Sequence, residues 1–352
     1  IPGEIFALAL NTTTNTLYVG GAFNNVNGGT IRNNMAAINA STGVATSFDP
    51  NMNDYVRALV LDSSTNTLYA GGNFTSVNGG TTRNGVAVFT TSSDIATGFD
   101  PNINDEVDAL ALDLSTNTLY AGGWFTQVNG GTSRAHLVAV DTGTAIATGF
   151  APNPNDAVEA ILLDSANNVL YIGGFFTSVN GGTTRNRLAA FNSTNGMLTS
   201  FDTNMSNGVF SFALNTTDAT LYAGGSFSSV NGGTSRNRLA AFATNTGIAT
   251  SFNPNMGAFG SVYALSLIDF VAKSLYVGGQ FASVGGESRT DFAAFREPVV
   301  PPAPTPVPVA PVTTSETLAP TGQSQNFFGG LALCLIGVSF LLSYKVYRLR
   351  KA

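Results

Sequence analysis

Few residues of this chain have the types needed for histidine or thiolate chemistry. His136 is the single histidine and Cys334 the single cysteine among 352 residues. A Ser-His-Asp triad therefore has one available centre, and neither a multi-histidine nor a cysteine metal site can be formed. We predict that His136 is a solvated loop residue after a turn and that the chain has no catalytic histidine.

The best candidates for paired acid–base chemistry are Asp108 and Glu159, because two carboxylates are what glycosidases use. They stand at equivalent positions of successive sequence repeats, each the second residue of an apolar run. This residue differs between repeats while its neighbours hardly change: Phe6, Arg57, Asp108, Glu159, Phe210 and Tyr263. If the fold brings the six together, aromatic and charged side chains would suit a sugar or a peptide. Functionless variation is the ordinary explanation for such positions; the functional alternatives are a ligand-binding ring, which we favour as the candidate site, and a catalytic carboxylate pair.

Three other patterns have a structural and a functional interpretation. Trp124 and Phe175 replace smaller or polar residues of the other repeats and predict either an aromatic patch or packing between units. An arginine recurs in every repeat: Arg32, Arg83, Arg134, Arg185, Arg236 and Arg289. One site does not need six copies, so we expect each guanidinium to bridge turn carbonyls, with a ring of anion or glycan contacts as the alternative.

Loops such as 49–54 and 100–105 place Asp and Asn oxygens at alternate positions, which calcium favours. The equivalent loop around Pro152 lacks the first Asp. Asp and Asn are also ordinary turn formers. We expect turns and no cofactor, with calcium as the alternative.

All these residues belong to one internal repeat, which must position them. A Leu-Tyr-x-Gly-Gly pattern recurs with tyrosines 51 residues apart, and 54 apart for the last pair: Tyr18, Tyr69, Tyr120, Tyr171, Tyr222 and Tyr276. Each repeat holds four short apolar runs separated by turn residues, which is typical of an antiparallel β-meander. Asn78-Gly79 and its copies favour a primed turn, expected between the second and third strands.

A single sheet of this size cannot bury both faces, whereas copies arranged radially can cover one another. We therefore predict an all-β fold over residues 1–297, a β-propeller of about six four-stranded blades. A β-solenoid is the alternative, but its coils are usually shorter and lack regular Asn-Gly hairpins. The runs Gly72-Asn73-Phe74 and Val77–Asn84 resemble the delta-60 type repeats of bacterial and fungal surface proteins. That resemblance implies propeller blades and a surface location, and no activity.

The ends of the repeat region suggest a ring that this chain does not complete. The last repeat, which stops at Arg296, lacks the fourth strand, and a strand supplied in its place would lie upstream of Ile1. Residues 1–4 have neither the basic start nor the apolar core of a signal peptide. We expect the chain to be truncated or processed at its N-terminus.

The remaining residues have the order of a surface anchor. Residues 298–317 form a Pro-rich spacer. An apolar stretch at 327–344, within the segment 318–352, is long enough for a transmembrane helix, and a basic tail follows. Before it stand Leu318, Ala319, Pro320, Thr321 and Gly322. This order resembles a Leu-Pro-x-Thr-Gly cell-wall sorting signal, in the Leu-Ala-x-Thr-Gly form read by some class E sortases.

These patterns together predict an extracellular module tethered at its C-terminus to a bacterial cell wall or membrane. The resemblance implies a sortase-type transpeptidase as partner, with cleavage between Thr321 and Gly322. A net charge of −6 and a pI of about 4.7 exclude the electrostatic footprint of a nucleic-acid binder. We expect a non-enzymatic module that binds a glycan or protein ligand and serves in adhesion. The alternatives are an envelope-bound carbohydrate-active enzyme and a purely structural surface-layer component.

Overall fold

The computed structural model describes residues 1–257, 259–268 and 274–296. The described residues do not include the predicted spacer, sorting motif, transmembrane helix and basic tail. They also do not include the place where an outer strand of the last repeat would stand, so the prediction that this strand is missing concerns residues outside the described ranges. The described ranges are all-β, and no apolar helix of membrane-spanning length occurs in them.

Six repeated units, here called blades 1 to 6, each contain a three-stranded antiparallel sheet. The first strands are β1 (Gly3–Asn11), β6 (Val56–Asp62), β11 (Val107–Asp113), β16 (Val158–Asp164), β21 (Val209–Asn215) and β26 (Ser261–Ile268). The central strands are β2 (Thr16–Phe23), β7 (Thr67–Gly72), β12 (Thr118–Gly123), β17 (Val169–Gly174), β22 (Thr220–Gly225) and β27 (Ser274–Gln280). The third strands are β5 (Met35–Asn39), β10 (Val86–Thr90), β15 (Leu137–Asp141), β20 (Leu188–Asn192), β25 (Leu239–Ala243) and β30 (Phe292–Arg296).

Each blade also carries a separate hairpin of two two-residue strands between its central and third strands. The pairs are β3 (Asn25–Val26) with β4 (Thr30–Ile31), β8 (Ser76–Val77) with β9 (Thr81–Thr82), and β13 (Gln127–Val128) with β14 (Thr132–Ser133). They continue with β18 (Ser178–Val179) and β19 (Thr183–Thr184), β23 (Ser229–Val230) and β24 (Thr234–Ser235), and β28 (Ser283–Val284) and β29 (Glu287–Ser288).

The Asn-Gly turn has the predicted primed geometry but a different place in the chain. Asn78 and Gly79 both have positive φ, 50° and 72°, and the amide of Gly80 donates to the carbonyl of Val77 at 3.1 Å. The turn closes the small hairpin β8–β9 and does not join the second and third strands of the sheet. A hairpin this short needs the left-handed preference of Asn-Gly because it has few ladder bonds of its own.

The predicted fourth strand is reduced to a single bridge in blades 1 to 5, such as Phe89 to Ala96. Side chains form hydrogen bonds with backbone amides and carbonyls of the outer segment that a longer strand would pair with its neighbour. Asn78 accepts from the Ala96 amide and donates to the Asp94 carbonyl, at 2.9 and 2.7 Å, and Arg83 donates to the carbonyl of Thr97. The blade is therefore three-stranded with a bridged outer segment, because these side chains satisfy the outer backbone instead of a ladder.

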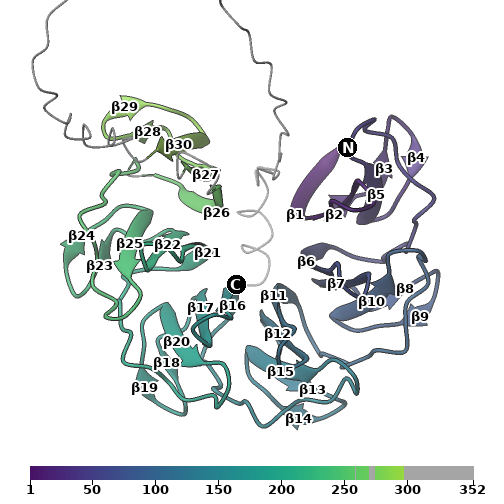
Figure 1. Ribbon diagram of the computed structural model, residues 1–352, viewed down its shortest axis with the longest axis horizontal. Coiled ribbons are helices and arrows are strands. Elements are labelled where there is room, and N and C mark those ends of the chain that lie inside the picture. Colours follow the sequence, from purple (N-terminus) through teal and green to yellow (C-terminus); the bar gives the residue numbers. More distant parts are fainter. Residues whose placement is uncertain (258, 269–273, 297–352) are drawn as a thin grey trace, which may run out of the picture.

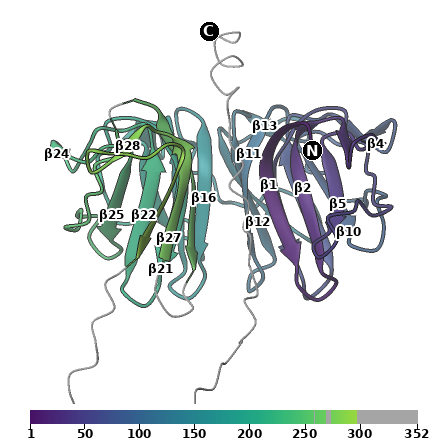
Figure 2. The same ribbon diagram turned by 90° about the horizontal axis from the view of Figure 1, so that it is seen from above.

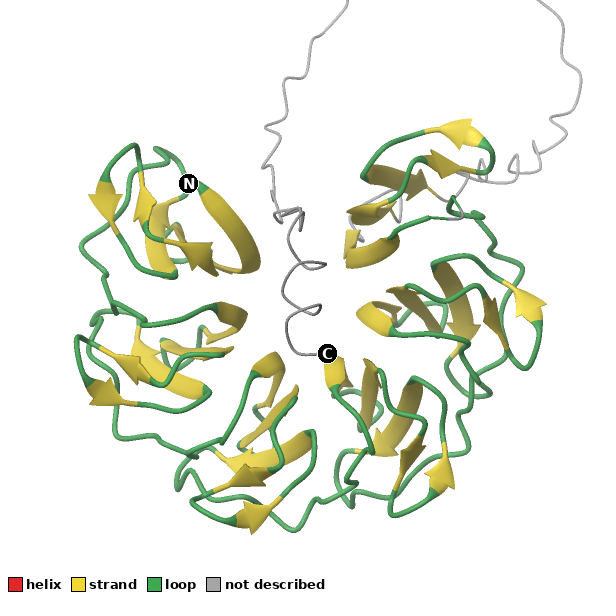
Figure 3. Cartoon of the chain, turned by 180° about the vertical axis from the view of Figure 1, so that it is seen from behind, coloured by secondary structure: helices red, strands yellow, loops and turns green. Residues whose placement is uncertain are grey.

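The blades stand side by side in an open arc about a common axis, with the first strands innermost and the small hairpins at the periphery (Figures 1 and 3). Figure 2 shows the strands running roughly parallel to that axis. Neighbouring blades share apolar clusters. Tyr120 of blade 3, for example, packs edge-on against Phe150, which packs against Phe191 of blade 4, with ring centroids 5.6 and 5.9 Å apart. Burial between blades, rather than within one sheet, forms the core.

Candidate binding rim

The six variable residues of the predicted ring all stand at one irregularity of the first strand. In blade 2, Val56 pairs with Gly72 and Ala58 with Gly71, so Arg57 between them is the extra residue of a β-bulge. The same register shift occurs at Phe6, Asp108, Glu159, Phe210 and Tyr263. A bulge re-aims a side chain, and one at the same place in every blade sets all six at the end of the fold where the first strands begin. We call this end the rim.

On blades 1 to 3, the structure joins three of the predicted residues through Arg57. Its guanidinium lies 4.4 Å from the ring centroid of Phe6, and its Nε donates to Oε1 of Glu106 at 2.8 Å and lies 3.9 Å from Asp108. Burial by itself lowers the pKa of Arg57, but the negative charges of Glu106, Asp108 and Glu159 more than offset it and raise the pKa above its ordinary value. Arg57 is thus a fixed cation within a carboxylate cluster.

On blades 3 to 6, aromatic rings form a continuous row, here called the aromatic row. Trp124 contacts Phe175, Phe175 contacts Phe210, and Phe210 stacks on Tyr263, with centroids 6.4, 5.5 and 5.6 Å apart. All four side chains are only partly buried. The predicted patch at Trp124 and Phe175 and the predicted ring residues Phe210 and Tyr263 are therefore one surface.

A third variable position belongs to the rim, and the sequence reasoning missed it. It lies two residues before each ring residue, and its carbonyl accepts from the residue after Gly-Gly, as Glu106 does from Trp124 at 2.9 Å. Its occupants are Glu4, Tyr55, Glu106, Ala157, Gly208 and Ser261. Their variation beside a constant Val or Ile was the available signal.

The residues at this third position change in concert with the aromatic row. A Cβ on Gly208 would lie 2.8 Å from ring carbons of both Phe175 and Phe210, so the absence of a side chain there lets the two rings meet. In blade 3, by contrast, Glu106 is buried and holds Arg57 of the neighbouring blade. The rim of each blade therefore has three variable positions: the bulge residue, the residue two places before it, and the residue after the Gly-Gly pair.

His136 lies near this rim but is half-buried, and not the solvated residue that we predicted. It has a φ of 62°, and its Nδ1 is 3.2 Å from the carbonyl of Gly123. Burial lowers the pKa of His136. The equivalent Arg187 and Arg238 reach one residue further and donate to the carbonyl after the Gly-Gly pair, on Phe175 and Ser226. His136 is partly buried because it lies against Gly123, at the end of the central strand β12 of its own blade.

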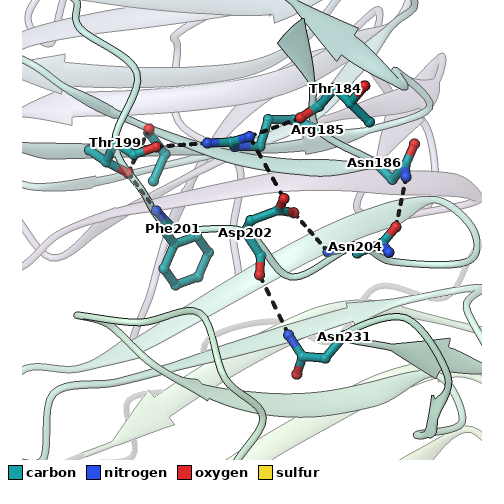
Figure 4. Close-up of polar contacts among 9 residues, drawn as sticks. Thr184, Arg185, Asn186, Thr199, Phe201, Asp202, Asn204 and Asn231 are labelled. Atoms are coloured by element: carbon teal, nitrogen blue, oxygen red, sulfur yellow. Dashed lines mark hydrogen bonds and ion pairs between the residues drawn. The ribbon is translucent and has the colours of Figure 1, made fainter.

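The recurring arginines form the predicted bridges in blades 1 to 5. Arg185 donates to the carbonyls of Thr184 and Thr199, both at 2.9 Å, and lies 3.7 Å from the Asp202 carboxylate (Figure 4). The carbonyl of Asp202 in turn accepts from Asn231 of blade 5 at 3.5 Å. The same two guanidinium donors bind equivalent carbonyls at Arg32, Arg83, Arg134 and Arg236. Each guanidinium ties the small hairpin to the outer segment.

Replacing Arg185 by alanine is expected to lower the free energy of unfolding by about 2 kcal/mol, because two charge-assisted hydrogen bonds disappear. Chemical denaturation monitored by circular dichroism measures the change. The exposed Arg296, at the end of β30, serves as the control, and Arg296→Ala should stay within about 0.5 kcal/mol of the parent chain. Equal effects for the two variants would contradict the bridging role.

In the candidate calcium loop 49–54, the oxygens of Asn53 and Asp54 are engaged in hydrogen bonds. Asn53 Oδ1 accepts from the amides of Thr75 and Ser76, both at 2.9 Å, and Asp54 accepts from Asn73 at 2.8 Å. Asn104 and Asn155 repeat the first pattern in the next two blades. These loops connect one blade to the hairpin of the next, which supports the turn interpretation.

Clefts also open at the opposite end of the strands, between blades 1 and 2 and between blades 3 and 4. Tyr18 and Phe48 line the first, and the equivalent Tyr120 and Phe150 line the second. The Tyr120 hydroxyl donates to the Ser193 carbonyl of the next blade at 3.0 Å. These clefts follow from the packing of one blade on the next, whereas the rim residues differ from blade to blade.

Comparison with known proteins was made against family models and against curated sequences. No family model matches this chain, and no curated protein sequence matches it.

Proposed function

We propose that this chain is a cell-surface β-propeller that binds a glycan at the rim, without catalysing a reaction. The observation that carries the proposal is the aromatic row, which runs unbroken over blades 3 to 6 and is built from two positions that vary between blades. Sugar rings present apolar faces that pack on partly exposed aromatic rings, and their hydroxyls donate to carboxylates. The row and the partly exposed carboxylate of Glu159 offer both at one end of the fold.

The two carboxylates are poorly arranged for glycoside hydrolysis. A glycosidase needs one of its two carboxyl groups to reach the glycosidic oxygen and protonate it as the general acid. Asp108 lies 3.9 Å from the Arg57 guanidinium, and its side chain is only 9% exposed. A carboxyl group that is paired with a buried cation and shielded from solvent is in a poor position to protonate a bound sugar.

The binding proposal predicts that Phe210→Ala and Tyr263→Ala each weaken glycan affinity about five- to thirtyfold, since each removes a ring worth roughly 1–2 kcal/mol of contact. Binding of the full chain to a glycan array identifies the ligand, and titration calorimetry then measures both variants. Ile146→Ala, an exposed apolar residue on the far turn of blade 3, is the control and should bind as the parent does. Loss of binding in the control alone, or no glycan bound at all, refutes the proposal.

For the tether, we propose sortase attachment through residues 318–322, supported by the ordered sequence of motif, apolar stretch and basic tail. Thr321→Ala should retain the protein in the membrane fraction of a sortase-containing bacterial host, because the substitution removes a side chain of the motif that the transpeptidase recognises. Fractionation of cell wall and membrane measures the distribution, with Thr317→Ala as a control that should remain wall-attached. Wall attachment of Thr321→Ala would contradict the idea.

A further inference from the structure

The five interfaces between neighbouring blades are built alike. On one side is a forward face, which in blade 1 is Tyr18, Met35 and Ala37; on the other is a rear face, which in blade 2 is Leu68, Ala70 and Phe89. These six residues belong to a single buried cluster. Equivalent residues form the shared cluster between blades 3 and 4. Every blade with a neighbour on a given side therefore buries that face.

Blade 6 leaves its forward face uncovered by any described residue. Phe292 is 43% exposed, whereas its equivalents in blades 1 to 5 are completely buried: Met35, Val86, Leu137, Leu188 and Leu239. Ala294 is exposed and Tyr276 is only partly buried, although their equivalents in blade 4, Ala190 and Tyr171, are almost fully buried. An apolar face that five other blades hide is thus open to solvent.

Blade 1 shows the complementary defect on its rear face. Leu17 and Ile38 are partly exposed, but in blades 2 to 5 the equivalent residues are fully buried, as Leu170 and Phe191 are in blade 4. The apolar cluster on this side of blade 1 contains residues of blade 1 alone, including Val19, Phe23 and Ala36. The two ends of the arc are therefore the two halves of the interface that recurs five times inside it.

From these two faces we infer that the arc binds one further blade of the same repeat between blades 6 and 1. Continuity with the existing interfaces determines the chemistry of this occupant. It must present a rear face of Leu and Phe to Phe292 and a forward face of Tyr and small apolar residues to Leu17 and Ile38. Burial of both faces removes the apolar surface that the arc now exposes.

A second copy of the whole chain does not fit the same geometry. The six blades already occupy more than half of the circle about their axis (Figure 1). A second six-blade arc docked on blade 6 with the same blade-to-blade rotation would run into blade 1 of the first. The head-to-tail interface can therefore be continued only by an occupant smaller than the chain itself.

The test adds the blade to the full chain. A second copy of residues 154–204 is placed directly before Ile1, because Met205, which follows this segment in the chain, stands at the position equivalent to Ile1. The added blade should raise the midpoint of thermal unfolding by about 5 °C or more. It should also lower the binding of a hydrophobic fluorescent dye at least twofold. The matched control carries aspartate at Leu170 and Tyr171 of the added copy only and should show neither change.

Phe292→Ser makes the test specific for the end face. In the six-blade chain, Phe292→Ser should leave the midpoint of thermal unfolding nearly unchanged, since Phe292 is exposed. In the seven-blade fusion, the same change should lower the midpoint by several degrees. That decrease should be about as large as the one that Leu239→Ser causes in either chain. Equal effects of Phe292→Ser in both chains, or a fusion no more stable than its aspartate control, would overturn the inference. So would a dimer of the six-blade chain in light scattering that Phe292→Ser dissociates, because a second copy would then be the occupant.

Discussion

Gly174→Ala is expected to lower the free energy of unfolding by about 3 kcal/mol, the upper part of the usual range for overpacking. A Cβ on Gly174 would overlap the carbonyl oxygen of Ala157, the residue just before the adjacent strand β16. Neither backbone can move aside freely, because the amide of Phe175 donates to that same carbonyl at 2.9 Å and the amide of Gly174 donates to Arg187 at 3.0 Å. The second glycine of every Gly-Gly pair meets an equivalent carbonyl, which explains why it recurs in all six blades.

Chemical denaturation of Gly174→Ala against Gly149→Ala measures this effect with a matched control. A Cβ on Gly149 meets no atom within 4 Å, and its backbone does not have positive φ. Gly149→Ala should therefore change stability by less than about 1 kcal/mol, and in the stabilising direction, because alanine restricts the unfolded chain. A Gly174→Ala protein as stable as Gly149→Ala would show that the strands are not in this close contact.

Glu106→Gln is expected to cost about 3 kcal/mol, because it leaves the Arg57 guanidinium buried without its closest anion. The side chains of Arg57 and Glu106 are only 11% and 3% exposed, so water cannot replace the lost charge. Asp108 lies farther from the guanidinium, at 3.9 Å, and compensates only in part. Denaturation at neutral pH and low salt measures the loss.

A double variant separates the charge from the packing. Arg57→Met with Glu106→Leu removes both charges and should recover most of the stability, since apolar residues of similar volume replace a buried ion pair at little cost. The exposed Glu287→Gln in β29 should change stability by less than about 0.5 kcal/mol. If the double variant were less stable than Glu106→Gln, the pair would not be the buried, mutually dependent contact described here.

Much of the blade could be predicted from residues close together in the repeat. The Leu-Tyr-x-Gly-Gly pattern predicted the central strand, Asn78-Gly79 predicted a primed turn, and the recurring arginine predicted a bridge between carbonyls, and the structure confirms all three. The strand count per blade was wrong, because apolar spacing does not reveal that Asn78 and Arg83 satisfy the outer backbone. The partners of the Asn-Gly turn were wrong for a similar reason, since an inserted two-residue strand has too short a pattern to detect.

The candidate site was predicted only in part. Variation at Arg57, Asp108 and Phe210 could be seen by aligning repeats, but their partners could not. Glu106 and Gly208 stand two residues before the ring positions, and their importance depends on contacts with residues of a neighbouring blade or strand, to Arg57 and to Phe175. The half-burial of His136 likewise depends on how its strand packs on the blade.

The sequence by itself determined the all-β class, the repeat and its length, and which positions differ between repeats. These properties depend on turn preferences and apolar periodicity, which act over a few residues. Only the tertiary structure decided that a β-bulge in every blade directs the variable residues to one rim, that the aromatic row crosses four blades, and that the faces at the two ends of the arc match. These features depend on contacts between residues that are dozens of positions apart in the chain, which form only when one blade packs on the next.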